Sequence, residues 1–319
     1  MSHSTGKSPL NSTPGANRRQ AGAAILVALL VVALAAMAAS GFMFHSQVEW
    51  RRLDNLVKLD QARSVLHTAE QWGAAVLQED ARHSSVDYPG EAWASRLPPV
   101  DAEGYQVSGQ IEDQDGRFNL NNLVQSGKVD ERQLAIFGRL LGNLRLPVAL
   151  AATLADWMDA DDVPINENSA ENAYYLRLTP PYHAANRPLI SVNELLRVKG
   201  YDRDVVVRLR PFVTALPART PVNLNTASPE VIAALMESLS LDDAYALVAR
   251  RARAYYRNVQ DFQQALPSGL SIAEDLVTVS SHFFLVQARI RRERLSLGEQ
   301  ALYQRAGTEY PTLIWRAEL

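Results

Sequence analysis

The fold is decided by the stretch Arg18-Arg19-Gln20-Ala21-Gly22-Ala23-Ala24-Ile25-Leu26-Val27, which continues to position 44 without a charged residue. As a helix, residues 21–44 extend about 36 Å, more than the roughly 30 Å of a bilayer's hydrocarbon core. The residues before this stretch include Lys7, Arg18 and Arg19 but no acid, a bias that keeps a segment in the cytoplasm. The sequence therefore predicts one membrane-spanning segment, with most of the chain across the membrane.

Three interpretations of this segment differ in how it is processed. A secretory signal peptide would be cut among the small residues at 33–40, and a simple anchor would stay uncut. A prepilin-type leader would be cut after Gly22, so that Ala23 begins a retained helix. The basic pair before a glycine favours the leader, and so does the sequence that follows. Apolar residues recur at helical spacing beyond the membrane segment, without Pro or Gly from 42 to 72, which predicts a helix of about 55 residues.

Strand-like sequence lies on both sides of a long helical region. Residues 105–111 alternate in polarity, and Asp115-Gly116 predicts a hairpin turn with a returning strand. Residues 129–272 show short helical patterns, and strand-like sequence returns at 277–290, 295–302 and 311–319. We expect an α+β fold, in which a long N-terminal helix packs on a small antiparallel sheet and a large all-α domain is inserted.

The helical region contains an internal duplication over residues 189–213 and 222–265. In each half, Ser or Thr together with Asn supplies helix caps, as at Ser228-Pro229-Glu230. These halves look like helix-hairpin-helix or sterile-alpha-motif-like units. The expected segments are a leader at 1–22, a transmembrane part of the stem helix at 23–44, an α+β body at 45–123 and 273–319, and helical subdomains at 124–216 and 217–272.

Residues 156–172 hold six carboxylates and three amide side chains but no Lys or Arg. Such charges repel one another unless a cation neutralises them, and Ca²⁺ accepts six to eight oxygen ligands in flexible geometry. Composition leaves a solvated acidic loop as the alternative, and the spacing is not that of an EF-hand. The candidate ligands are Asp159, Asp161, Asp162, Glu167 and Glu171, while Asp156 is expected to cap a helix or to support the ligands.

The sequence contains no motif that indicates an enzyme. The chain has no cysteine, which excludes disulfides, thiolate metal sites and cysteine nucleophiles. Its six histidines are scattered, and no motif of a zinc hydrolase, a serine hydrolase or a nucleotide-binding loop occurs. We therefore expect neither a catalytic residue nor an organic cofactor.

Nucleic-acid binding is the main alternative function, as an exported helix-hairpin-helix protein for DNA uptake. Such units hold phosphate through a glycine-rich hairpin. Residues 236–243, at the hairpin position, have no glycine and contain three acids, and the formal charge of the chain is −3. The arginines at 250, 251, 253 and 257 are more typical of a solvated helix face. We therefore expect no nucleic-acid partner.

From Arg18 to its C-terminal end, the chain resembles the type IV pilin-like proteins and, among them, the K minor pseudopilins of the type II secretion system. The resemblance rests on the leader junction, the Asn119-Leu120-Asn121 block, the acidic block and the large helical insertion. It rests also on Val27, the fifth mature position, where most pilin-like proteins have Glu. It implies cleavage between Gly22 and Ala23, methylation of the new amine, and structural Ca²⁺ in the helical domain.

The resemblance further implies the surroundings of the protein. These are inner-membrane lipid around a single-pass helix, a periplasmic C-terminal part, and processing by prepilin peptidase. The implied role is to cap the tip of the pseudopilus and to start assembly with the I and J minor pseudopilins, above the H minor pseudopilin and the major pseudopilin. A buried stem Glu is costly unless it pairs with a neighbour's amine, so an apolar Val27 indicates a subunit with no neighbour above it.

Overall fold

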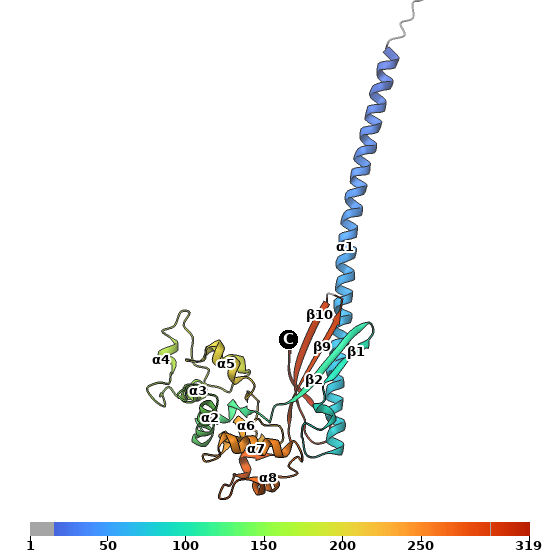
Figure 1. Ribbon diagram of the computed structural model, residues 1–319. Coiled ribbons are helices and arrows are strands. Elements are labelled where there is room, and N and C mark those ends of the chain that lie inside the picture. The colour runs from blue at the N-terminus through green and yellow to red at the C-terminus, as the bar shows by residue number, and fades with distance from the viewer. Residues whose placement is uncertain (1–15, 294) are drawn as a thin grey trace, which may run out of the picture. The chain divides into compact units, whose positions relative to one another are not determined.

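The computed structural model describes residues 16–293 and 295–319, with side chains from residue 22 onward (Figure 1). The described residues divide into two compact units, the first ending at Gln61 and the second beginning at Ala62. Helix α1 (Ala16–His83) contributes to both and, at 68 residues, is longer than predicted. Within the described chain it is the one helix long and apolar enough to cross a membrane, and none of its apolar stretch is buried. Most of the expected leader, residues 1–15, lies outside the described residues.

A five-stranded antiparallel sheet forms the body of the second unit, in the order β1-β2-β9-β10-β11. Its strands are β1 (Leu97–Ala102), β2 (Tyr105–Asp113), β9 (Phe283–Arg292), β10 (Leu295–Gln304) and β11 (Thr312–Glu318). Alternate residues of β9, such as Phe284 and Val286, pack with Ala74 and Leu77 of α1, because successive strand side chains point to opposite faces. The predicted class, a long N-terminal helix on a small antiparallel sheet, is confirmed.

Strand β1 is absent from the sequence prediction because it contains Pro98 and Pro99. Proline cannot donate a ladder hydrogen bond, so it is found at sheet edges. β1 is an edge strand that pairs with β2 alone, through a turn whose residues Glu103 and Gly104 both have positive φ. The edge position explains how a strand forms despite its two prolines.

The hairpin predicted at Asp115-Gly116 is wrong. After β2 the chain leaves the sheet, and β3 (Phe118–Asn119) pairs in parallel with β6 (Val213–Thr214). The Asp113 carboxylate accepts a hydrogen bond from the Asp115 amide at 2.8 Å, and the Asp115 carboxylate accepts one from the His282 amide at 2.5 Å. Gly116 serves close packing, because a Cβ there would overlap Thr226 Oγ1. These contacts direct the chain into the helical domain.

The predicted strand at 277–290 is likewise interrupted. β8 (Val277–Thr278) pairs in parallel with β7 (Val222–Asn223), and β9 begins only at Phe283. The bend between them contains Ser281 and His282, whose amides donate to the buried carboxylates of Asp87 and Asp115. The predicted strand at 277–290 thus contributes β8 to one sheet and β9 to another.

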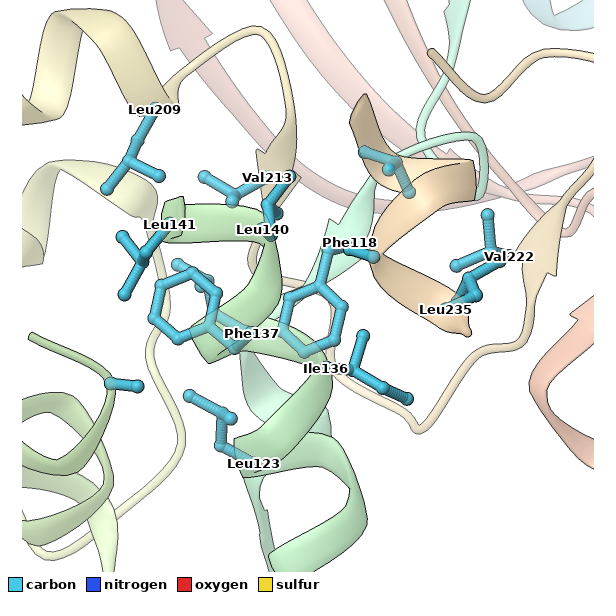
Figure 2. Close-up of a cluster of buried hydrophobic side chains, with 14 of the residues drawn as sticks. Phe118, Leu123, Ile136, Phe137, Leu140, Leu141, Leu209, Val213, Val222 and Leu235 are labelled. Atoms are coloured by element: carbon cyan, nitrogen blue, oxygen red, sulfur yellow. The ribbon is translucent and has the colours of Figure 1, made fainter. Parts of the chain in front are cut away.

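The inserted region is mostly helical and has a hydrophobic core of its own (Figure 2). Its helices are α2 (Glu131–Asn143), α3 (Leu150–Met158), α4 (Asn172–Tyr175), α5 (Arg203–Leu209), α6 (Pro229–Leu235), α7 (Leu241–Arg251) and α8 (Val259–Ala265). Short 3₁₀ helices η2 (Leu120–Leu123), η3 (Val192–Arg197) and η4 (Glu274–Leu276) and the hairpin β4 (Val124–Gln125)–β5 (Lys128–Val129) complete it, while η1 (Ala92–Ala94) belongs to the body. The core contains Leu209 from the first expected subdomain and Leu235 from the second.

The Asn119-Leu120-Asn121 block joins distant loops of this domain. Asn121 Nδ2 donates to the carbonyls of Leu189 and Leu216, both at 2.9 Å, and its Oδ1 accepts from the Leu189 amide at 2.7 Å. Asn119 Nδ2 donates to the Ala218 carbonyl at 2.8 Å. Asn119 is buried and Asn121 half-buried, and removing either side-chain amide costs free energy because the backbone groups that it satisfies lose their partners.

A second polar cluster joins α1 to the sheet. The Glu70 carboxylate, fully buried, accepts hydrogen bonds from Arg316 Nε at 2.6 Å and from the Tyr303 hydroxyl. Burial opposes ionisation, but the bonds from Arg316 and its other neighbours prevail and lower the pKa of Glu70 to about 2. Burial and then hydrogen bonding with Glu70 raise the pKa of Glu299 to about 7. The pair therefore shares one negative charge at mildly acidic pH.

We predict that Asn121→Ala lowers the free energy of unfolding by about 2–4 kcal/mol, because three backbone groups lose their partner. Urea unfolding of the full chain in detergent, followed by circular dichroism, measures this. Asn55→Ala, at an exposed position of α1, is the control and should stay within about 0.5 kcal/mol of the parent. Equal effects of the two variants would contradict the prediction.

The Glu299 carboxyl predicts a pH dependence of stability. Its folded pKa lies above the unfolded value, so the folded protein loses stability as pH rises from about 4.5 to about 7. Glu299→Gln removes this loss, and its stability should fall less than that of the parent between pH 5 and pH 8, by at most about 3 kcal/mol. Urea midpoints at both pH values test this, with exposed Glu309→Gln as the control. An unchanged pH dependence in Glu299→Gln would refute it.

Candidate metal centre

The acidic block forms the loop between α3 and α4. Every residue of α3 is buried, including Asp156 in its last turn. Both Asp156 carboxylate oxygens accept from the Ile165 amide at 3.2 Å, which folds the loop back onto the helix. Ser169 Oγ donates to the Asn166 carbonyl at 2.8 Å and closes a turn within the loop. The loop is therefore held by its own polar groups at both ends.

Three carboxyl groups converge beneath this loop. Asp156, Asp159 and Glu171 are 0%, 4% and 3% exposed, and one oxygen from each lies within 4.8 Å of the others. Asp159 Oδ1 and both Glu171 oxygens have no hydrogen-bond partner among the described residues. An unpartnered buried carboxylate oxygen is costly, and a bound cation is the usual means of satisfying several at once.

The charges of this cluster disfavour its ionisation. Burial, followed by the charges of Asp161 and the other neighbouring carboxylates, raises the pKa of Asp159 to about 7. Burial and the charges of Asp156 and Asp159, among others, raise the pKa of Glu171 to about 8. A divalent cation reverses this balance, because it attracts the charged form of each carboxyl.

The remaining candidates lie at the surface of the loop. Asp161, Asp162 and Glu167 are exposed. Asp161 Oδ1 accepts from the Val163 amide at 2.8 Å, and Asp162 Oδ1 accepts from Asn172 Nδ2 at 2.5 Å. Thus the structure brings two of the five sequence-predicted ligands into the buried group and adds Asp156, which was expected only to support them.

Spacing along the helix would have identified Asp156 as a member. It lies three residues before Asp159, and residues three apart share one face of a helix. The apolar residues around it in α3 indicate that this face is buried. The highest density of acids lies downstream of Asp159, where the chain turns outward, and composition therefore favours those exposed residues.

Lys199 is the cation beside the loop. Its Nζ donates to the carbonyls of Asn168 and Ser169 at 3.0 and 3.2 Å and lies 5.0 Å from the centre of the Tyr174 ring. Within the described chain, no ion pair joins it to the three converging carboxylates. The lysine thus stabilises the loop backbone and leaves the carboxyl charges uncompensated.

The processing residues lie on α1 in the first unit. Gly22 and Ala23 are both helical and exposed, and Val27, one turn further along, is 59% exposed. The helix passes through the expected cleavage junction without a break. The side chain at position 27 is thus on an exposed helix surface within the apolar stretch.

The basic run on and after α7 is partly structural. Arg251 Nη1 donates to the Leu224 carbonyl at 2.5 Å, and burial lowers its pKa to about 10. Arg250, Arg253 and Arg257 are exposed. The connection between α6 and α7 carries the exposed Glu237. Of these four arginines, Arg251 is therefore part of the packing of the helical domain.

Comparison with known proteins identifies relatives over most of the chain. Two protein-family models, both described as type II secretion system (T2SS), protein K, match residues 116–218 and 222–280 of this chain. Protein K of the type II secretion system from Pseudomonas aeruginosa is 36% identical, over 89% of this chain and 86% of its own length. The corresponding protein from Aeromonas hydrophila is 32% identical, over 86% and 89%.

A solved structure shares the fold. A chain in the crystal structure of the GspK-GspI-GspJ complex from the enterotoxigenic Escherichia coli type 2 secretion system matches with a TM-score of 0.74 and 24% identity. The match covers 84% of this chain and 99% of the other. The α+β body and the helical insertion therefore recur together in that protein.

The unpartnered Glu171 predicts a substitution that stabilises the protein when metal is absent. Its folded pKa exceeds the unfolded value, so the parent loses stability as pH rises from about 4.5 to about 8. In chelator at pH 9, Glu171→Gln should be more stable than the parent, by about 1–4 kcal/mol. Urea unfolding measures the difference, and exposed Glu167→Gln in the same loop should have little effect. A destabilised Glu171→Gln under these conditions would contradict the assignment.

Proposed function

The chain belongs to the type II secretion system protein K family, and from this membership we propose that it is the minor pseudopilin at the tip of the pseudopilus. In this role it is a structural, non-enzymatic subunit that caps the filament and initiates its assembly for protein export across the outer membrane. The observation that carries the proposal is the large helical domain, which occupies the chain between β3 and β8.

The place of this domain supports a capping role. The ring of Tyr88, just after α1, stacks on that of Tyr255 in the helical domain with centroids 3.9 Å apart. Asn223 Nδ2 donates to the Asp87 carbonyl at 3.2 Å. The domain therefore packs against the segment that directly follows the end of α1. In a filament of parallel stem helices, a subunit above would need the space beyond those ends.

The stem determines location and processing in this proposal. Prepilin peptidase cuts between Gly22 and Ala23, and the new amine is methylated. The uncharged helix then lies in inner-membrane lipid, with the body and the helical domain in the periplasm. Val27 leaves the stem without the acid that would pair with the amine of a subunit above it.

The partners follow from the same role. We propose contacts with the I and J minor pseudopilins in a tip complex, and with the H minor pseudopilin and the major pseudopilin below. The matching crystal structure is that of a complex of GspK with GspI and GspJ, which supports the first two contacts. Small stem residues, such as Ala24, Ala28 and Gly41, would let neighbouring helices approach closely in lipid.

We propose Ca²⁺ as the ion of the metal centre. The donors are all oxygens, which suits a hard cation, and the orphaned oxygens of Asp159 and Glu171 point to a missing partner. Asp156, Asp159 and Glu171 would hold the ion, and Asp161, Asp162 and Glu167 would add charge at the surface. The ion would supply structural stabilisation by binding the folded state alone.

Calcium should therefore reverse the order of stability that we predict in chelator. At saturating Ca²⁺ the parent should gain about 3 kcal/mol or more, whereas Glu171→Gln should gain much less. Thermal unfolding with Ca²⁺, with Mg²⁺ and with chelator measures this, and Glu167→Gln serves as the control. A parent protein that melts at the same temperature in Ca²⁺ and in chelator would overturn the calcium assignment.

Position 27 tests the role at the tip. Val27→Glu should sharply reduce secretion, because a charge at a membrane-embedded position costs about 3 kcal/mol and here lacks a partner. The apolar control Val27→Leu should retain secretion. Secretion in cells that lack the parent gene, together with membrane levels of each variant, provides the readout. Full secretion by a normally abundant Val27→Glu variant would count against an apolar tip stem.

A further inference from the structure

The helical domain carries an open groove that is distinct from the metal centre. It lies between α2, α3 and the segment after α6, and its volume is about 720 Å³. Gly138, Ala152 and Met236 form its buried floor. Val148 and Ile165, 57% and 39% exposed, form its walls. We call this the α2–α3 groove.

Small residues on one face of α2 keep the groove open. Ala135, Gly138 and Gly142 follow one another at steps of three and four, so they lie on one side of the helix. A Cβ at Gly142 would have no atom within 4 Å. The protein therefore does not fill the groove itself, and another backbone can approach α2 closely at this face.

The charge available at the rim of the groove is negative. Glu131 and Glu237 line it and are exposed, and among the described residues neither side chain has a hydrogen bond or an ion pair. Arg139 is the one cationic lining residue, and its Nε donates to the Ala234 carbonyl at 2.8 Å. The charge of Glu237 also attracts Arg139, but with two carboxylates and one arginine the rim stays negative.

We propose that the α2–α3 groove binds an amphipathic helix of a partner protein, with aliphatic side chains on the seated face and Lys or Arg at its flanks. The face of α2 that bears Gly138 and Gly142 suits a helix, since small residues permit close approach of two helices. The basic flanks complement Glu131 and Glu237. A concave surface with an acidic rim does not match a flat anionic lipid surface. This proposal depends neither on the calcium assignment nor on the position at the tip.

Photocrosslinking in the full-length protein tests the proposal in secreting cells. Benzoylphenylalanine replaces Gly142, where the open space admits it, and in a control variant replaces Val207, which is 60% exposed on α5. The residue at 142 should crosslink to protein, and sequencing of the adduct should place it in an amphipathic helix with basic flanking residues. Adducts to lipid, adducts to an acidic segment, or a yield no higher than at position 207 would each overturn the proposal.

A second test reverses the charges of the two carboxylates at the rim of the groove. Glu131→Lys with Glu237→Lys should lower the crosslink yield from position 142 by about tenfold or more, because like charges then face each other. Asp204→Lys with Glu309→Lys makes the same change in net charge at exposed positions outside the groove and should leave the yield unchanged. Melting temperatures of the purified variants verify that both remain folded. Equal yields from the two double variants would also overturn the proposal.

Discussion

The hydrogen bonds of one carboxylate, that of Asp113 at the end of β2, hold the inserted domain to the sheet. It accepts from the Asp115 amide at 2.8 Å, from Asn223 Nδ2 at 3.1 Å, from Ser281 Oγ at 2.7 Å and from the Thr226 hydroxyl. These donors come from the chain leaving the sheet, from the helical domain and from the chain returning to the sheet. Because the Asp113 carboxylate accepts hydrogen bonds from all three segments, it fixes the inserted domain to the sheet.

The structure uses buried acids in two different ways. At the joint, Arg305 binds Asp87 at 2.5 Å and Asp80 at 2.9 Å, so these carboxylates have a cationic partner within the protein. Under the acidic loop, Asp159 and Glu171 have oxygens without any such partner in the described chain. In the folded protein Arg305 supplies the counter-charge of the first cluster. In the second cluster a bound cation would have to supply it. The cationic partner Arg305, and not the number of acids, distinguishes the Asp80 and Asp87 cluster from the candidate metal centre.

Periodicity and charge predicted the long helix, the antiparallel sheet and the helical insertion, because each is encoded locally. The errors occur where a distant contact decides the conformation. Asp115-Gly116 has the composition of a hairpin turn, yet Gly116 packs against Thr226, a residue far along the chain. Asp156 is an error of another kind, because its helical spacing from Asp159 indicates a shared face, which a count of acids does not reveal. Strand β1 forms despite two prolines because it lies at the sheet edge, which only the strand order shows.

The proposed role requires a stem that prepilin peptidase processes and that remains in the membrane. Intact mass and N-terminal sequencing, on protein made with and without the peptidase, test it most directly. We expect a mature chain that begins at Ala23 and carries one additional methyl group, found only when the peptidase is present. A mature chain that begins near Ala39 or Ser40, in either strain, would show that the helix is discarded and that the proposed role is wrong.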